Sequence, residues 1–98
     1  RGSVGTQSLK VDYEDHTVRV FRLKFPSDLH HMNEALCFMG IVIVLKGDIR
    51  IEASSPGDSE LVPHDLNEGD LVWNDGGTKF RFAIPVRTEA EALVVLMK

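Results

Sequence analysis

Apolar residues recur along this chain in short segments bounded by Gly, Pro, Asn and Asp, and this pattern constrains the fold more than any other feature. In residues 48–53, for example, Ile49, Ile51 and Ala53 alternate with charged side chains. A period of two is typical of a half-buried β-strand, and helical periodicity is almost absent from the chain. About eight such segments, with turn residues between them, predict an all-β sandwich or barrel.

The expected strands can be placed from the positions of the turn residues. We expect them over residues 17–25, 36–45, 48–53, 71–73, 79–84 and 92–97, with a further short strand near Leu61. The second and third are predicted to form a hairpin around Gly47. In the first, apolar residues change phase after Val20, which predicts a β-bulge there.

Length, charge and cysteine content limit the class of protein. A chain of 98 residues with 43% apolar residues suffices for one domain with a core. We expect a barrel over residues 17–98, and a tag remnant with a lead or edge strand over residues 1–16. The net charge of −4 disfavours direct nucleic-acid binding. One cysteine excludes an internal disulfide and indicates an intracellular compartment, and no segment predicts a membrane span.

Two segments, residues 41–45 and 93–97, are apolar on both faces of the expected strand. An antiparallel sheet with one solvated face alternates instead, and the sequence predicts no helix long enough to cover a second face. A second copy of the chain is therefore the expected cover, in a homodimer. The predicted interface residues are Leu36, Phe38, Ile41, Ile43, Leu45, Leu93, Val95 and Met97. The alternative is a barrel whose outer face exposes a few scattered apolar residues.

The segments VLKGDIRIEA and LNEGDLVWNDGGTKFRFAI, followed by a last apolar strand, resemble the core of cupins, which are small jelly-roll β-barrels. Metal-binding cupins carry histidines and a glutamate in two glycine-containing motifs. Gly69 and Gly77 match glycines of the second motif, but Gly40 stands at the glutamate position, Phe80 at a histidine position and Ile84 at an asparagine position. None of these side chains is a metal ligand. The resemblance therefore implies a cupin-like jelly-roll barrel without metal, cofactor or catalysis.

Phe80 at the histidine position, together with an end directly after the last strand, resembles the C-terminal cupin of centromere protein C. That family is a homodimerisation domain of inner kinetochore proteins. The resemblance implies a nuclear protein-interaction module that brings two copies of its parent together at the centromere and offers a docking face to a centromere assembly protein. The alternative is a ligand-sensing cupin domain of a transcription regulator, with a pocket at Trp73, Phe80 and Phe82. A metal-dependent isomerase or dioxygenase is disfavoured by the missing ligands.

The remaining residues with reactive side chains carry weaker signals. His30, His31 and Glu34 lie close together in an expected loop, where solvated histidines are favoured over a metal site. Cys37 lies within an apolar run, which predicts a small buried side chain rather than a nucleophile. His64 has no carboxylate partner at an informative spacing.

Overall fold

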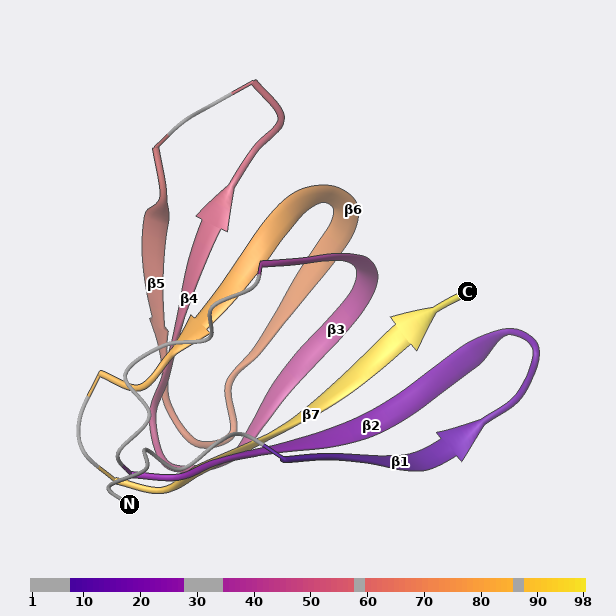
Figure 1. Cartoon of the computed structure of the whole chain (residues 1–98), viewed down its shortest axis with the longest axis horizontal. Helices are drawn as coiled ribbons and strands as arrows, with labels where there is room; N and C mark the ends of the chain where they lie inside the picture. The colour runs from indigo at the N-terminus through magenta and orange to yellow at the C-terminus, as the bar shows by residue number, and fades with distance from the viewer. Residues whose placement is uncertain (1–7, 28–34, 58–59, 86–87) are drawn as a thin grey trace, which may run out of the picture.

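Seven β-strands form the ordered framework of the structure, a computed structural model that describes residues 8–27, 35–57, 60–85 and 88–98. They are β1 (Ser8–Glu14), β2 (Val18–Phe25), β3 (Leu36–Lys46), β4 (Ile49–Ser54), β5 (Val62–Leu66), β6 (Leu71–Ala83) and β7 (Ala90–Met97). The strands pair antiparallel in the order β1-β2-β7-β3-β6-β4-β5 (Figure 1). Among the described residues no helix occurs that could cross a membrane. The predicted all-β class is confirmed.

β3 and β6 are the longest strands, and their curvature folds the sheet over itself. The two strands pair from Leu36↔Phe80 to Ile43↔Leu71. The C-terminal part of β6 pairs with β4 as well. Figure 1 shows both strands bending at the same end of the molecule, so that β4 and β5 form a second layer opposite β2 and β7. This arrangement is the predicted jelly-roll.

The bend in β6 is held by a buried asparagine. Asn74 is 2% exposed, and its side-chain amide donates to the carbonyl of Thr78 at 2.8 Å. Its Oδ1 accepts from the N–H of Gly76 at 3.0 Å, and Gly76 has a φ of +96° that favours glycine. The prediction of two separate strands over residues 71–73 and 79–84 was wrong, because the chain turns here without leaving the sheet.

Apolar side chains at alternate positions fill the space between the two layers. The largest fully buried apolar side chains are Phe25, Phe82, Leu23, Ile49, Ile51, Val42, Val44 and Val94. β2 alternates regularly, with Phe21 inward and Val20 outward, so the predicted bulge near Val20 was wrong. The irregularity lies in its neighbour β1, between Val11 and Tyr13.

The predicted hairpin around Gly47 was also wrong. β3 pairs with β6 and β7, whereas β4 pairs with β5 and β6. Gly47 has a φ of +74°, and a Cβ at this position would lie 2.5 Å from the carbonyl oxygen of Glu89. At Gly47 the chain therefore runs close to the start of β7 and continues into the second layer. It does not fold β4 back onto β3.

β1 is an edge strand that pairs with β2. This agrees with one of the two structures expected for the N-terminal segment, while residues 1–7 lie outside the described part of the chain. The predicted barrel boundary at residue 17 stays a prediction.

Candidate interaction surfaces

The outward side of the larger layer carries an apolar row that crosses five strands. Tyr13 of β1 is in register with Val20 of β2, which is opposite Val95 of β7. Val95 is opposite Ile41 of β3, and Ile41 is opposite Trp73 of β6. Residues in register on adjacent strands lie on the same face of a sheet, so the five side chains are neighbours.

Two parallel rows extend this row on both sides. Leu93, Ile43 and Leu71 are in register on one side, and Val18, Met97 and Met39 on the other. We call the combined set the outer apolar face: Tyr13, Val18, Val20, Met39, Ile41, Ile43, Leu71, Trp73, Leu93, Val95 and Met97. Its members are exposed or half-buried, with exposures of 55% for Tyr13, 62% for Leu71 and 52% for Trp73.

Most of the predicted interface residues lie on this face. Ile41, Ile43, Leu93, Val95 and Met97 belong to it, and Leu45 is exposed further along β3. Whether they form an interface stays a prediction.

Leu36 and Phe38 were wrongly included in the interface prediction. Both contribute to the core, and Phe38 is only 8% exposed. Their inclusion was an error of phase, because a run of continuous apolar residues does not show which alternate set points outward.

Sequence reasoning missed the contributions of β1, β2 and the first half of β6. Trp73 was expected beside the inner phenylalanines, but its register with Ile41 places it on the outer apolar face. Tyr13, Val20 and Leu71 carried no separate signal, because only the pairing of distant strands brings them together.

Charged residues border this face near the edge strand. Arg22 lies opposite Leu93 and makes ion pairs with Asp12 at 3.1 Å and with Glu91 at 3.2 Å. An apolar centre with a charged margin is the usual anatomy of a protein–protein interface.

The interior positions at which the cupin motifs predict ligands hold no ligating side chain. Phe80 and Ile84 are buried in the apolar core between the layers, and Gly40 is buried within β3. Phe80 packs edge-to-face on Phe38, with ring centroids 5.8 Å apart. A Cβ at Gly40 would collide with the backbone carbonyl of Val95, so a glutamate has no room there.

The other candidate ligands and the cysteine are separate from this interior. The described residues contain no group of three His, Cys, Asp or Glu side chains that could hold a metal. His30, His31 and Glu34 lie outside the described residues. Cys37 is exposed, and its Sγ donates to the carbonyl of Gly76 at 3.3 Å. The prediction of a buried cysteine was wrong, because position 37 belongs to the outward-facing set of β3.

A groove of about 390 Å³ opens between β5 and the first half of β6. Trp73 and Phe80 line it, together with Ile51 and Val62. Phe82, the third residue of the predicted pocket, is fully buried and stacks at an angle on Phe25 with ring centroids 5.9 Å apart. Its assignment to the pocket was therefore wrong.

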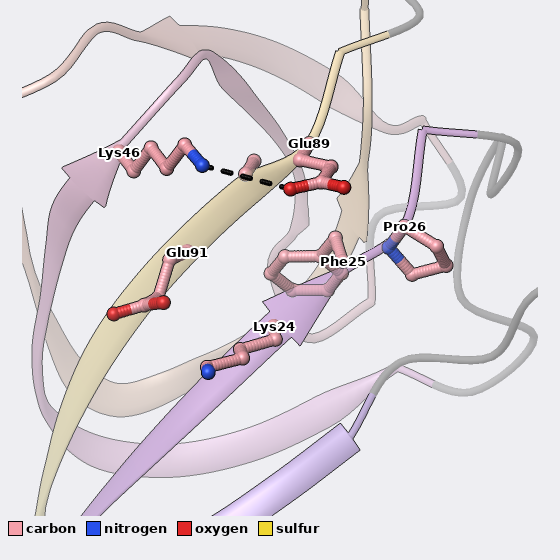
Figure 2. Close-up of a pocket in the computed structure, with 7 residues that line it drawn as sticks. Lys24, Phe25, Pro26, Lys46, Glu89 and Glu91 are labelled. Atoms are coloured by element: carbon pink, nitrogen blue, oxygen red, sulfur yellow. Dashed lines mark ion pairs between the residues drawn. The ribbon is translucent and has the colours of Figure 1, made fainter.

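A second cavity, of about 330 Å³, lies where β2, β3 and β7 meet (Figure 2). Lys46 and Glu89 form an exposed ion pair of 3.5 Å there. Lys24 and Glu91 occupy opposite positions on β2 and β7. With two cations and two carboxylates, this cavity has no clear preference for a charged ligand.

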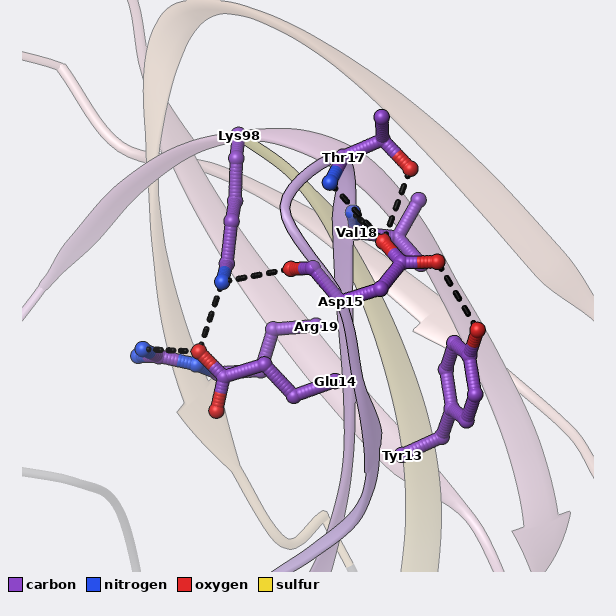
Figure 3. Close-up of polar contacts among 7 residues, drawn as sticks. All are labelled: Tyr13, Glu14, Asp15, Thr17, Val18, Arg19 and Lys98. Atoms are coloured by element: carbon purple, nitrogen blue, oxygen red, sulfur yellow. Dashed lines mark hydrogen bonds and ion pairs between the residues drawn. The ribbon is translucent and has the colours of Figure 1, made fainter.

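The turn between β1 and β2 is organised by one carboxylate (Figure 3). Asp15 accepts hydrogen bonds from the backbone N–H groups of Thr17 at 2.8 Å and Val18 at 2.9 Å, and from the hydroxyl of Tyr13 at 2.8 Å. These bonds, led by the one from Thr17, hold the pKa of Asp15 well below its ordinary value. The arrangement is that of a turn-stabilising aspartate.

Glu14 and Lys98 fasten the end of β7 to this turn. The Lys98 ammonium donates to Glu14 Oε2 at 2.6 Å and to the carbonyl oxygen of Asp15 at 2.7 Å. Arg19 also donates to Glu14, at 2.8 Å. The hydrogen bonds from Arg19 and then Lys98 lower the pKa of Glu14 to about 2. Together these contacts join the end of β7 to the β1–β2 turn.

Comparison with known proteins identifies the fold. No protein-family model and no curated protein matches the sequence. Among solved structures, an RmlC-like cupin family protein with a double-stranded β-helix fold from Methanocaldococcus jannaschii has a TM-score of 0.75 at 19% identity, covering 94% of this chain and 80% of that one. A cupin domain from Bordetella pertussis has a TM-score of 0.72 at 17% identity, covering 100% and 99%.

The CENP-C cupin domain of Drosophila melanogaster is also similar, with a TM-score of 0.67 at 14% identity over 92% of this chain and 72% of that one. A structure of CENP-C from the same organism bound to CAL1 has a TM-score of 0.64 at 15% identity, covering 78% and 58%. At these identities the likeness concerns the fold. The chain therefore has the double-stranded β-helix fold of the cupins, as the resemblance of its sequence to cupins implied.

Proposed function

We propose that this chain is a non-catalytic homodimerisation and protein-interaction module in which two copies pack their outer apolar faces together. The observation that carries the proposal is the row from Tyr13 to Trp73, which is in register across five strands. A self-complementary patch of this kind suits a two-fold symmetric dimer, because each copy presents the same surface.

Hydrophobic burial would dominate the energy of association. Removing an exposed large apolar side chain from water contributes about 1.5–3 kcal/mol, whereas a surface ion pair contributes about 0–1 kcal/mol. Tyr13, Leu71 and Trp73 are each more than half exposed in the single chain. The ion pairs of Arg22 at the margin would then favour one orientation of the two copies more than they would add affinity.

In this proposal the parent is a centromere protein C-like inner kinetochore protein that acts in the nucleus, at the centromere. The similarity to the Drosophila CENP-C cupin domain, and to CENP-C bound to CAL1, supports a role in protein interaction. Joining two parents would raise the effective concentration of binding segments elsewhere in them. The net charge of −4 supports the absence of direct nucleic-acid contact by this domain.

The filled interior supports the non-catalytic part of the proposal. Gly40, Phe80 and Ile84 place a backbone contact and apolar side chains where metal-binding cupins have ligands or polar groups. The competing ligand-sensing function has one observation in its favour, the groove beside Trp73 and Phe80. Binding of a peptide methylated on its backbone nitrogens separates a small-molecule pocket from a peptide site there.

Replacing Val95 by glutamate tests the proposed dimer. Val95 is half-buried at the centre of the outer apolar face, so the substitution would place an unpaired carboxylate from each copy in the interface. We expect about a hundredfold or greater loss of dimer affinity, because a buried charge without a partner is strongly unfavourable. The measurement is solution mass by light scattering, with the far-ultraviolet circular dichroism spectrum unchanged.

Two further variants control for effects on folding. Val94→Glu puts the same charge at the neighbouring, fully buried position and should unfold the domain. Leu61→Glu changes an exposed apolar residue outside the outer apolar face and should leave the mass unchanged. A Val95→Glu protein that keeps the mass of the wild type would reject this face as the interface.

A further inference from the structure

The two walls of the groove between β5 and β6 differ in kind. β5 contributes Val62, His64 and Leu66, which are alternate residues, so the face of this strand lines the groove. Before its bend β6 contributes the consecutive residues 71–73, whose side chains point to both faces of the sheet, and after the bend it contributes Thr78 and Phe80. Consecutive residues line a cavity together when the edge of the strand forms the wall. In the part of the chain that the structure describes, residues 71–73 pair with β3 alone.

The backbone of this edge directs hydrogen-bonding groups into the groove. The backbone N–H of Val44 donates to the carbonyl oxygen of Asp70 at 2.9 Å, and the carbonyl oxygen of Val44 accepts from the N–H of Gly69 at 2.8 Å. The backbone N–H and carbonyl groups of Val44 therefore point toward β6. Backbone groups alternate in direction along a strand, so those of Val42 also point toward β6, whereas those of Ile41 and Ile43 point toward β7.

The register between β3 and β6 then fixes the direction of the backbone N–H and carbonyl groups in β6. Val72 lies opposite Val42, whereas Leu71 and Trp73 lie opposite Ile43 and Ile41. Leu71 and Trp73 thus form the pairs that exchange no hydrogen bonds with β3, and their N–H and carbonyl groups point away from it. Such a row of outward backbone groups is the template for an added strand.

The surroundings of the edge favour a particular sequence in that strand. Below the edge, the inner face of the second layer offers Ala53 and Val62, which suits apolar side chains at alternate positions. Asp70 and Asp75 flank the edge. The described lining residues include no lysine or arginine. Basic residues at the ends of the added strand would therefore be favoured.

We propose that this groove binds an extended peptide segment of a partner protein, which adds a strand to the edge of β6 at Leu71 and Trp73. The peptide carries apolar side chains at alternate positions and basic residues at its ends. Residues 71–73 provide an edge of about 10 Å at roughly 3.4 Å per residue, enough to pair with three or four peptide residues, as in other cases of β-strand addition. The inference goes beyond the proposed dimer, because the peptide would pair with the backbone groups of this edge, whereas the dimer would cover the outward side chains of Leu71 and Trp73.

Amide hydrogen exchange tests the proposal directly. The probe is a synthetic octapeptide that alternates Val with Thr and carries Lys at both ends. At saturating peptide, exchange of the Leu71 and Trp73 amides should slow by about tenfold or more, because both N–H groups gain acceptors. The amide of Val72, which faces β3, serves as the internal control and should change little.

Two controls identify the mode of binding. A peptide N-methylated at alternate residues keeps its side chains but loses the N–H groups that would pair with the edge, and should not bind. In the protein, Val62→Glu should weaken binding by about tenfold, because it puts a charge against the apolar face of the peptide. Leu61→Glu, at the adjacent residue outside the groove lining, should leave the affinity unchanged.

Three results would overturn the inference: no saturable binding, unchanged exchange at Leu71 and Trp73, or equal binding of the N-methylated peptide. The last would assign the groove to side-chain or small-molecule recognition. Solution mass measured on the same samples keeps this outcome separate from the proposed dimer. A monomer that still protects Leu71 and Trp73 on peptide addition would reject the dimer and retain the peptide site.

Discussion

At the scale of single residues, the contacts of Glu14 with Arg19 and Lys98 predict a pH-dependent contribution to stability. The pKa of Glu14 falls from its ordinary value of 4.5 to about 2 in the folded chain. The unfolded chain therefore takes up a proton first as pH falls, and the contribution of this carboxylate is complete above about pH 5 and lost toward pH 2. In Glu14→Gln we expect a lower melting temperature than the wild type at pH 7 and a difference that shrinks between pH 4.5 and 2. Thermal unfolding across this pH range measures the difference, and a difference that is independent of pH would contradict the ion pairs.

The identity of a residue does not reveal the direction in which its side chain points. Phe80 and Ile84 were predicted to replace polar groups of a metal-binding barrel, and both are buried in its interior. Cys37 and Trp73 were expected inside and are exposed. The difference is one of strand phase, since a shift by one residue exchanges the inner and outer faces.

At the scale of strands, local pattern predicted where most strands run but not which strands pair. The segments over residues 17–25, 36–45, 48–53 and 92–97 agree with β2, β3, β4 and β7 within a few residues. The predicted hairpin at Gly47 was wrong because a tight turn can either pair β4 with β3 or lead β4 into another layer. The close contact of Gly47 with Glu89 accompanies the second arrangement. The bend in β6 depends on hydrogen bonds of Asn74 that have no periodic signature.

Because β3 lies close to β7 at Gly40, a substitution of this glycine should strongly affect stability. A Cβ there would collide with the carbonyl of Val95, and the backbone of β7 cannot move away without disturbing its pairing with β2. Gly40→Ala should lower the free energy of unfolding by about 1–3 kcal/mol, the usual cost of overpacking. Gly77→Ala is the matched control, because its Cβ would meet only the movable side chain of Asp75 at 3.3 Å. Urea unfolding of the two variants measures the difference, and equal midpoints would show that the β3–β7 contact relaxes freely.

At the scale of the whole molecule, the outer apolar face and the groove are adjacent surfaces. The outer apolar face spans five strands of the larger layer, whereas the groove lies at the open side between the layers, and Leu71 and Trp73 are the boundary between them. The sequence predicted a two-sided apolar sheet and hence a partner for its outer side. It could not predict the groove, because β5 and the first half of β6 face each other only after β3 and β6 bend.

The proposed dimer is tested most directly by the solution mass of the unmodified chain. Light scattering measures it from about 1 to 100 μM, the range in which a micromolar or tighter dimer is detected. The proposed dimer should have twice the mass of the 10.9 kDa chain over most of this range, with dissociation only on dilution. A mass of one chain at every concentration would contradict it and leave the outer apolar face without a second copy to cover it.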